Sequence, residues 1–376
     1  MQKAISFSSP IQENEEFRRE IVASLDATLS SGNFMLGAGV RNFENSFANY
    51  INTTYCIGVG SGTDALVLSM LALGITTGDE VLVPTFTASA TVVAITNVGA
   101  TPVFLDIGAE DYYIDFNAIE ANITARTKAI IFVHLYGSTG EIPKIKSLCA
   151  DHGIFLIEDC AQAAGAKYDE KRLGSFGDLS CFSFYPTKNL SAIGDGGAVL
   201  TNDVSLAESL LRKRQYGWDE NRECIESGIL SRLDELQGQI LLKKLGCLDN
   251  LNEKRQSIAR QYDEVLQTYG FKRYGLNSAV SHANHLYVIE VVDRARAFKL
   301  AENLQINLGI HYKKSVHEHP FFKRVPQRNS LLNSEIASQR VISLPLYPQL
   351  KQFELERVLR LIEFLSEEEL IAKERR

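Results

Sequence analysis

One lysine and one aspartate are the residues of this chain whose types and surroundings most suggest chemistry. Lys188 lies in a run rich in aromatic residues, 182–189, and a glycine-rich turn at 194–197 follows it. Asp159 ends an earlier apolar segment. A lysine amine forms a Schiff base with a carbonyl carbon, and a carboxylate keeps a pyridine nitrogen protonated. This pair of residue types therefore fits an enzyme that uses pyridoxal phosphate.

Small hydroxyl side chains able to bind a phosphate accompany this pair. Ser61 and Thr63 lie in a glycine-rich turn between a predicted strand and a predicted helix. The free backbone N–H groups at the start of a helix attract anions. Ser183 lies five residues before the lysine, and Gln162 follows the aspartate closely enough to hydrogen-bond the oxygen of a bound ring.

Each of these residues also has an ordinary structural explanation. Ser61 alone is a common helix N-cap, and Asp159 is equally well explained by an ion pair with an arginine. Lys188 alone is most simply a solvent-facing loop lysine. Glu158 is expected on the opposite face of its strand and is not counted as catalytic. The interpretation depends on the ordered set of residues, which chance rarely produces.

Length and charge restrict the class of protein. A chain of 376 residues exceeds the size at which one core usually stops growing, so two domains are expected. The net charge of −7 opposes a nucleic-acid partner, which needs a basic face. Neither a run of about 20 apolar residues nor an apolar signal segment is evident, so no membrane partner and a cytoplasmic location are expected.

The cysteines and histidines do not form patterns typical of metal sites. The six cysteines lack CxxC pairs, and the seven histidines lack HxxxH and HExxH spacing. Cys149, Cys160 and Cys181 lie in apolar segments and are explained as small core residues. We therefore expect a reduced protein without a metal site.

Apolar runs alternate with amphipathic segments between residues 55 and 201. The predicted strands are 56–59, 80–83, 101–105, 128–133, 154–157, 179–184 and 198–201, with predicted helices at 63–73, 89–98 and 143–152. Apolar strands separated by helices predict an α/β fold with a mostly parallel sheet buried on both faces. Ligands bind at the carboxyl ends of such strands, where Ser61, Asp159 and Lys188 are expected.

The remaining segments suggest a second domain. Helices are predicted at 13–29, 40–50, 204–216, 231–263, 294–304 and 352–367, and a β-rich patch at 283–291. The mixture after residue 250 predicts a division into a large cofactor-binding domain, 1–249, and a smaller C-terminal α+β domain, 250–376.

Over nearly its whole length the chain resembles the DegT/DnrJ/EryC1/StrS family of sugar aminotransferases. The shared motifs include residues 60–66 (Gly-Ser-Gly-Thr-Asp-Ala-Leu), 158–162 (Glu-Asp-Cys-Ala-Gln), the Lys188 run, 231–237 and 309–312. The resemblance implies the aspartate aminotransferase (type I) fold with a seven-stranded sheet. It also implies pyridoxal 5′-phosphate as the cofactor, with pyridoxamine phosphate as its other form.

The same resemblance implies a role for each candidate residue. Lys188 is implied to form the Schiff base and to carry the proton, and Asp159 to pair with the pyridine nitrogen. Gly62, Thr63 and Ser183 are implied to contact the phosphate, and Gln162 the ring hydroxyl.

The activity implied is amino transfer from L-glutamate to a keto sugar by a homodimer. Residues 215–218 resemble the branch that acts at C-3 of nucleotide-linked 3-keto-6-deoxy sugars, which serve cell-surface polysaccharides. A free keto-sugar acid, such as an oxidised octulosonate of lipopolysaccharide, is one alternative substrate. A regulatory protein that binds pyridoxal phosphate without turnover is an alternative of another class.

Three positions depart from the family pattern. Leu230 replaces an asparagine that, in many relatives, contacts the phosphate bound in the partner subunit. Ala88 stands where relatives have an aromatic residue that stacks on the cofactor ring, a role that Phe86 is able to take. The motif containing His311 and Tyr312 continues with Lys313 and Lys314. We treat residues 311–314 as candidate substrate residues, since two cations there suit a diphosphate or a sugar carboxylate. A solvated surface pair is the simpler explanation of the two lysines.

Overall fold

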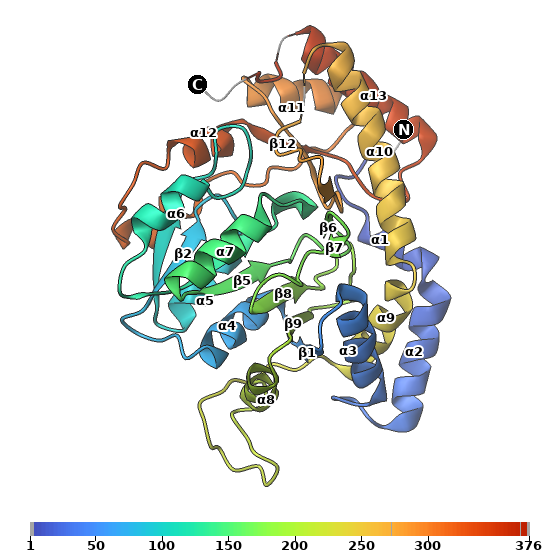
Figure 1. The fold of residues 1–376 in the computed structure, drawn as a ribbon. Coiled ribbons are helices and arrows are strands. Elements are labelled where there is room, and N and C mark those ends of the chain that lie inside the picture. The colour runs from blue at the N-terminus through green and yellow to red at the C-terminus, as the bar shows by residue number, and fades with distance from the viewer. Residues whose placement is uncertain (1–3, 272, 369, 374–376) are drawn as a thin grey trace.

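A seven-stranded sheet forms the centre of the molecule in the computed structural model, which describes residues 4–271, 273–368 and 370–373 (Figure 1). Its strand order is β1-β9-β8-β5-β4-β2-β3. The strands are β1 (Tyr55–Val59), β2 (Glu80–Pro84), β3 (Thr101–Leu105), β4 (Thr127–Val133), β5 (Phe155–Asp159), β8 (Leu179–Ser183) and β9 (Gly197–Thr201). β9 runs antiparallel to both its neighbours, and β8, β5, β4, β2 and β3 are parallel. The predicted α/β fold and mostly parallel sheet are confirmed.

Helices cover both faces of this sheet. One face packs on α4 (Gly62–Ala72), α5 (Ser89–Asn97) and α8 (Val204–Lys213). The other packs on α3 (Ala38–Ile51), α6 (Phe116–Asn122), α7 (Ile142–His152) and α9 (Glu235–Leu245). Successive side chains of a strand alternate between the faces. Val81 and Val83 therefore enter one core and Leu82 the other, which explains the uninterrupted apolar runs.

A third core lies in the C-terminal part of the chain. It is built from α10 (Leu248–Thr268), α11 (Arg294–Asn303) and α13 (Gln352–Glu367) around the antiparallel pair β11 (Tyr287–Glu290) and β12 (Val341–Leu344). Ile5, from the start of the chain, also packs in this core. The predicted boundary between residues 249 and 250 falls in the first turn of α10, and the division stays a prediction.

Smaller elements complete the described chain. α1 (Pro10–Glu16) and α2 (Arg18–Ser31) precede α3, and α12 (Leu332–Arg340) precedes β12. β6 (Lys167–Tyr168), β7 (Lys171–Arg172) and β10 (Val280–Ser281) form a short three-stranded sheet. Single 3₁₀ turns occur at Leu135–Gly137, Val316–Glu318 and Phe322–Arg324.

Three predicted helices differ from those observed. The helix expected at 13–29 is divided into α1 and α2, and the helix expected at 231–263 begins later and is interrupted after Leu245. Gly246, a poor helix former, occupies that interruption. The helix expected at 204–216 ends at Lys213, because Tyr216 and Gly217 take positive φ angles of 65° and 77°, which a right-handed helix cannot contain.

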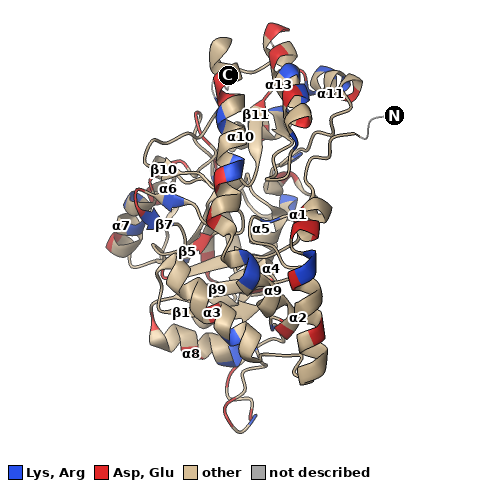
Figure 2. Cartoon of the chain, turned by 90° about the vertical axis from the view of Figure 1, so that its right-hand side faces the viewer, with Lys and Arg blue, Asp and Glu red and all other residues tan. Residues whose placement is uncertain are grey.

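Charged residues of both signs alternate along the outer helices, including α10 and α13 (Figure 2). This view therefore shows no continuous basic face of the kind that nucleic-acid binding requires. Among the residues described, none of the helices combines the length and apolar character needed to cross a membrane.

Candidate active site

The candidate residues gather at the carboxyl edge of the sheet. Asp159 is the last residue of β5, Ser183 is the last residue of β8, and Gly62 begins α4 after the two-residue turn that follows β1. β5 and β8 are paired neighbours in which Asp159 lies opposite Cys181. Lys188 follows β8 in a short turn in which its backbone N–H donates to the carbonyl of Tyr185 at 2.8 Å. The fold thus brings together segments that are distant in the sequence.

Lys188 and Asp159 lie close enough to alter each other's protonation. Burial lowers the pKa of Lys188 to about 8, and the negative charge of Asp159 opposes that shift. Burial raises the pKa of Asp159, while the N–H of Ala161, the hydroxyl of Thr91 and the charge of Lys188 act against the rise. An amine that deprotonates this readily suits attack on a carbonyl and proton transfer near neutral pH.

The Asp159 carboxylate is oriented by two donors. Thr91 donates its hydroxyl to Oδ2 at 2.8 Å, and the backbone N–H of Ala161 donates to Oδ1 at 3.1 Å. Among the described residues, Asp159 has no arginine partner of the kind considered from the sequence. A buried carboxylate held in this way retains lone pairs for a further cation, which the protonated nitrogen of a pyridine ring supplies.

The turn after β1 forms a second contact region beside β8. Ser61 caps α4, since its Oγ accepts the N–H of Asp64 at 3.1 Å. A Cβ atom added to Gly62 would lie 2.7 Å from the Cβ of Ser183, so this position requires a glycine. The helix start and the Ser183 hydroxyl therefore meet at one point, where a phosphate finds N–H and O–H donors. With Asp159 on the neighbouring strand, these donors fit pyridoxal phosphate.

Gln162 connects the cofactor region to the candidate substrate segment. Its Oε1 accepts the backbone N–H of Tyr136 at 2.7 Å, and its Nε2 donates to the hydroxyl of Tyr312 at 2.8 Å. The hydroxyl of Tyr136 donates to the carbonyl of His311. Tyr312 and His311 are thereby fixed beside the site, whereas Lys313 and Lys314 are exposed at the surface.

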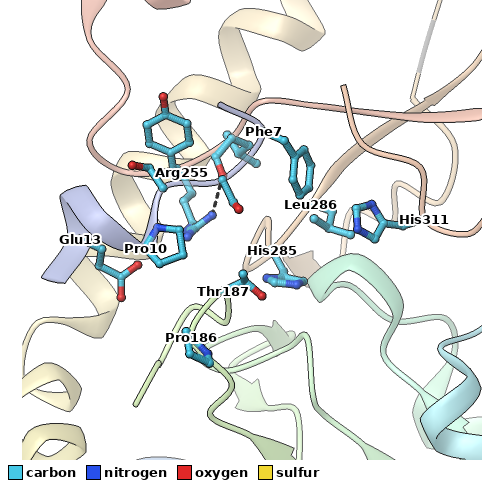
Figure 3. A pocket seen from close by; sticks show the side chains of 13 residues that line it. Phe7, Pro10, Glu13, Pro186, Thr187, Arg255, His285, Leu286 and His311 are labelled. Carbon is cyan, nitrogen blue, oxygen red and sulfur yellow. Dashed lines mark hydrogen bonds between the residues drawn. The ribbon is translucent and has the colours of Figure 1, made fainter. Parts of the chain in front are cut away.

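A cavity of about 50 Å³ lies next to the lysine turn (Figure 3). Its walls include Thr187, His285, His311 and Phe7. Burial first, and then the charge of Lys188, lowers the pKa of His311 to about 4 and that of His285 well below its ordinary value. Both imidazoles are therefore neutral at pH 7 and face the cavity as hydrogen-bonding groups rather than as cations.

The remaining departures from the family pattern lie in different surroundings. Ala88 precedes α5 and is partly exposed, whereas Phe86 is buried with its ring centroid 6.3 Å from that of Tyr312. Leu230 is 49% exposed and pairs with Gln215 in an isolated bridge. The structure of the single chain thus leaves Leu230 at the surface.

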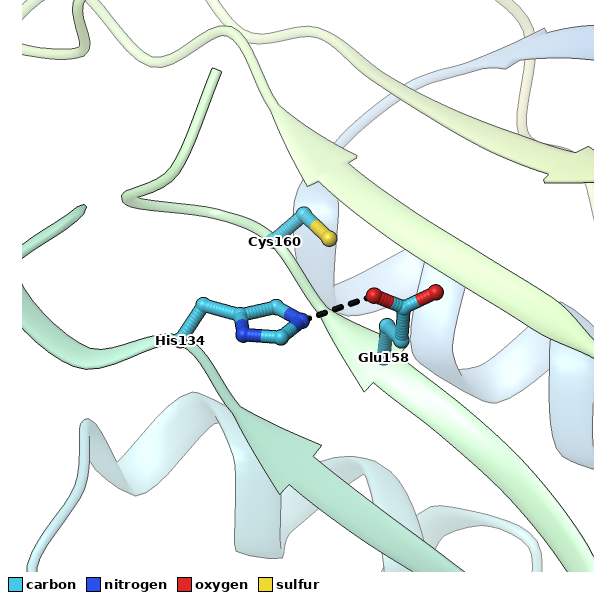
Figure 4. A group of neighbouring side chains, drawn as sticks. All are labelled: His134, Glu158 and Cys160. Carbon is cyan, nitrogen blue, oxygen red and sulfur yellow. Dashed lines mark hydrogen bonds and ion pairs between the residues drawn. The ribbon is translucent and has the colours of Figure 1, made fainter. Parts of the chain in front are cut away.

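Glu158 points away from Asp159, as the strand alternation predicted, and meets His134 and Cys160 in a buried cluster (Figure 4). One carboxylate oxygen accepts from His134 Nε2 at 2.8 Å and from the N–H of Gly174, and the other accepts the N–H groups of Phe176 and Gly177. Four donors occupy the lone pairs of a carboxylate. Glu158 therefore anchors the 174–177 loop and has no lone pair left for a metal ion.

Sequence reasoning missed Thr91, which orients Asp159, and did not single out His285. Thr91 lies in the first turn of α5, 68 positions from Asp159, so no local pattern marks it. His285 hydrogen-bonds Asn189, the residue after Lys188, at 3.1 Å, a contact that also depends on the tertiary fold.

Comparison with known proteins places the chain among aminotransferases. The model of the DegT/DnrJ/EryC1/StrS aminotransferase family matches residues 15–363. A dTDP-3-amino-3,6-dideoxy-alpha-D-galactopyranose transaminase of Aneurinibacillus thermoaerophilus is 42% identical over 356 residues, covering 94% of this chain and 98% of that protein.

Two solved structures extend this similarity to three dimensions. Streptomyces venezuelae DesV, in complex with a ketimine intermediate, superposes with a TM-score of 0.94 at 35% identity, covering 97% of this chain and 99% of DesV. NtdA of Bacillus subtilis, with bound pyridoxamine phosphate, superposes with a TM-score of 0.87 at 31% identity, covering 94% and 82%. The sheet and the helices described above are thus those of a known enzyme architecture, the type I fold.

Proposed function

The chain belongs to the DegT/DnrJ/EryC1/StrS aminotransferase family, and we propose that it moves the amino group of L-glutamate to C-3 of a nucleotide-linked 3-keto-6-deoxy sugar. It is a transaminase dependent on pyridoxal 5′-phosphate. The observation that carries the choice of substrate is the 42% identity, over nearly the full length of both chains, to a transaminase of a dTDP-linked 3-amino-3,6-dideoxy sugar.

Lys188 is the proposed covalent anchor and proton carrier. When bound, pyridoxal phosphate withdraws electrons from the amino-bearing carbon and carries nitrogen between the two substrates. Lys188 would hold the cofactor through its amine, and its pKa, lowered to about 8, would make that amine a base near neutral pH when it is free. It then takes the proton from the α-carbon of glutamate and returns a proton in the reverse direction on the keto sugar.

The other site residues hold the ring so that this proton transfer is possible. Asp159, oriented by Thr91 and Ala161, keeps the ring nitrogen protonated. Gly62, Thr63 and Ser183 bind the phosphate at the start of α4, and Gln162 contacts the ring hydroxyl. The hydrogen bond between Gln162 and Tyr312 then connects the residue that contacts the ring to residues 311–314, the candidate substrate segment.

A panel of acceptors tests the choice of substrate. Enzyme loaded with pyridoxamine phosphate is mixed with nucleotide-linked 3-keto-6-deoxy sugars, other keto sugars, free keto-sugar acids and keto acids of amino-acid metabolism. We expect the fastest return of the pyridoxal form with a nucleotide-linked 3-keto sugar. Reaction with amino-acid keto acids and with none of the sugars would contradict the proposal.

The exposed pair Lys313 and Lys314 supports a free keto-sugar acid of lipopolysaccharide as the second candidate substrate. The pair follows Tyr312 directly, so two positive charges lie next to the residue that hydrogen-bonds Gln162. Replacing both lysines by glutamine separates the candidates. A loss confined to sugar acids favours the acid, and a loss with every nucleotide-linked acceptor favours binding of the diphosphate.

We further propose that the enzyme is a cytoplasmic homodimer in cell-surface polysaccharide synthesis. Apolar side chains on the segment between α8 and α9 support a partner subunit, since Tyr216, Ile225 and Leu230 are all exposed in the single chain. This segment projects from the body of the molecule at the bottom of Figure 1. Projecting apolar side chains are typical of residues buried in an assembly.

A further inference from the structure

Arg255 is a buried cation that forms no ion pair within the described part of the chain. It lies on the apolar stripe of α10, between Leu251 and Ile258, and is 4% exposed. One guanidinium nitrogen donates to the carbonyl of Leu346 at 2.8 Å. Among the described residues, no carboxylate forms an ion pair with it, although Arg273 elsewhere in the same core pairs with Asp263. A buried charge in this state is costly unless a ligand compensates it.

The guanidinium group lines the cavity beside the lysine turn. Arg255 enters from α10, and Thr187 and His285 face it from the other side (Figure 3). Thr187 directly precedes Lys188 in the chain. At roughly 10–15 Å³ for each water-sized group, a cavity of about 50 Å³ holds three to five non-hydrogen atoms, which is the size of a carboxymethyl group.

The charges around the cavity favour an anion. Glu13 also lines it, but one of its carboxylate oxygens accepts from Ser191 at 2.6 Å and from the buried amine of Lys244 at 3.3 Å. Burial lowers the pKa of Arg255 to about 10, against the opposing effect of Glu13, so the group stays protonated at pH 7. Arg255 and Lys244 carry two positive charges and Glu13 carries one negative charge, so these three groups have a net charge of one positive unit. Both histidines of the cavity are neutral.

We propose that Arg255 binds a carboxylate of the amino donor, a dicarboxylic amino acid such as L-glutamate, and of the 2-oxo acid formed from it. This inference rests on the proposed function in one respect, namely that the donor reacts at Lys188. A guanidinium offers two parallel N–H donors to a carboxylate, and burial strengthens such a bond. The hydroxyl of Thr187 and the neutral His285 complete the polar wall of the cavity.

Binding of an unreactive dicarboxylate tests this without turnover. Glutarate is titrated calorimetrically into holoenzyme of the wild type, Arg255→Gln and Arg255→Lys. We expect the Kd to rise about 30-fold or more in Arg255→Gln and less in Arg255→Lys, which keeps the charge. Arg273→Gln is the matched control, because Arg273 is also buried but does not line the cavity. Equal Kd values in the wild type and both Arg255 variants would overturn the proposal.

The two half-reactions separate substrate binding from structural damage. In Arg255→Gln the KM for L-glutamate is expected to rise about 30-fold, while the KM for the keto sugar stays within about twofold. Equal losses in both half-reactions would indicate a merely structural role. If Arg255→Gln does not fold, Arg255→Lys is measured in the same way, and an unchanged KM for glutamate in it would overturn the proposal.

L-Alanine identifies which carboxylate Arg255 holds. If Arg255→Gln still reacts with L-alanine as the wild type does, Arg255 binds the distal carboxylate of glutamate, which alanine lacks. If its reaction with L-alanine slows as much as its reaction with L-glutamate, Arg255 binds the α-carboxylate. A wild-type enzyme that takes the amino group of glutamate but aminates no keto sugar would refute the proposed function alone. The assignment of Arg255 would then stand on its own measurements.

Discussion

The lowered pKa of Lys188 makes a prediction about stability as well as chemistry. In the cofactor-free protein the folded state loses the Lys188 proton near pH 8, whereas the unfolded chain keeps it until the ordinary lysine value of 10.5. The unfolded state therefore binds more protons in this window, and stability rises with pH across it. Between pH 8 and 10.5 the free energy of unfolding of the wild type should rise by about 2 kcal/mol relative to that of Lys188→Met. This figure is smaller than the full pKa shift would give, because the Lys188 side chain is partly exposed.

Denaturant unfolding of the two proteins at several pH values measures this gain. Lys254→Met, a change at an exposed lysine, is the control and should track the wild type at every pH. A constant difference between the wild type and Lys188→Met across pH 8 to 10.5 would show that the Lys188 amine is not buried in the way described here.

Asp159 should stabilise the loaded enzyme and destabilise the cofactor-free one. Burial raises its pKa more than the charge of Lys188 lowers it, so ionising Asp159 in the absence of the cofactor weakens the fold, increasingly so as pH rises above its ordinary value of 3.8. Asp159→Asn should therefore raise the free energy of unfolding of the cofactor-free protein by about 1 kcal/mol at pH 7. The same change should slow the glutamate half-reaction about 100-fold or more. Loss of stability together with unchanged turnover would contradict the role assigned to Asp159.

Glu80 links β2 to the C-terminal part of the chain. This buried carboxylate accepts hydrogen bonds from Arg328 at 3.1 Å, Arg126 at 3.0 Å and Thr124 at 2.8 Å. The bond from Arg328, more than the opposing effect of burial, lowers the pKa of Glu80 to about 2. Its stabilising effect is therefore complete above pH 4.5 and is lost as pH falls toward 2.

Glu80→Gln should lower the free energy of unfolding by about 2 kcal/mol at pH 7, since it leaves two guanidinium groups without their carboxylate. The difference from the wild type should shrink as the pH is lowered from 4.5 to 2. Glu15→Gln removes an exposed pair with Arg18 and should cost less than about 0.5 kcal/mol. A penalty for Glu80→Gln that is independent of pH would indicate a loss of packing instead of a lost charge.

The strands were predictable from the sequence because each is buried on both faces. All five residues of β2 and all five of β9 are buried, so the apolar runs match the strands within two residues at either end. Helix ends were less predictable. Gly246 lies where α9 stops, but a single glycine within a helical pattern does not by itself predict a break. The conformation of Tyr216 that follows the end of α8 is stabilised by its bond to Ile229 across the segment.

The residues of the candidate site also differ in how far the sequence alone could identify them. Lys188, Asp159 and Ser183 could be found because each lies at or beyond the end of a strand, where an α/β sheet binds its ligands. Gln162 meets Tyr312 from 150 positions away, and Arg255 reaches the cavity from the long helix α10. These contacts depend on tertiary packing, although an arginine on an apolar helical stripe is a signal in itself.

The projecting segment between α8 and α9 is expected to hold the dimer together. Ile225 is 60% exposed in the single chain. Ile225→Asp should shift the protein from dimer to monomer at micromolar concentration, because a charge would be buried in the interface without a partner. Light scattering coupled to gel filtration measures the mass directly. Phe353→Asp, at an exposed position of α13, is the control and should leave the dimer intact. A wild-type protein that is monomeric would contradict the proposed assembly.

Amino transfer itself is measured most directly with labelled nitrogen. The enzyme is incubated with pyridoxal phosphate, L-glutamate labelled with ¹⁵N, and a dTDP-linked 3-keto-6-deoxy sugar, and the products are analysed by mass spectrometry and NMR. We expect one ¹⁵N on C-3 of the sugar for each 2-oxoglutarate formed, and no transfer by Lys188→Ala. Label that stays in glutamate, or that reaches only keto acids of amino-acid metabolism, would contradict the proposed function.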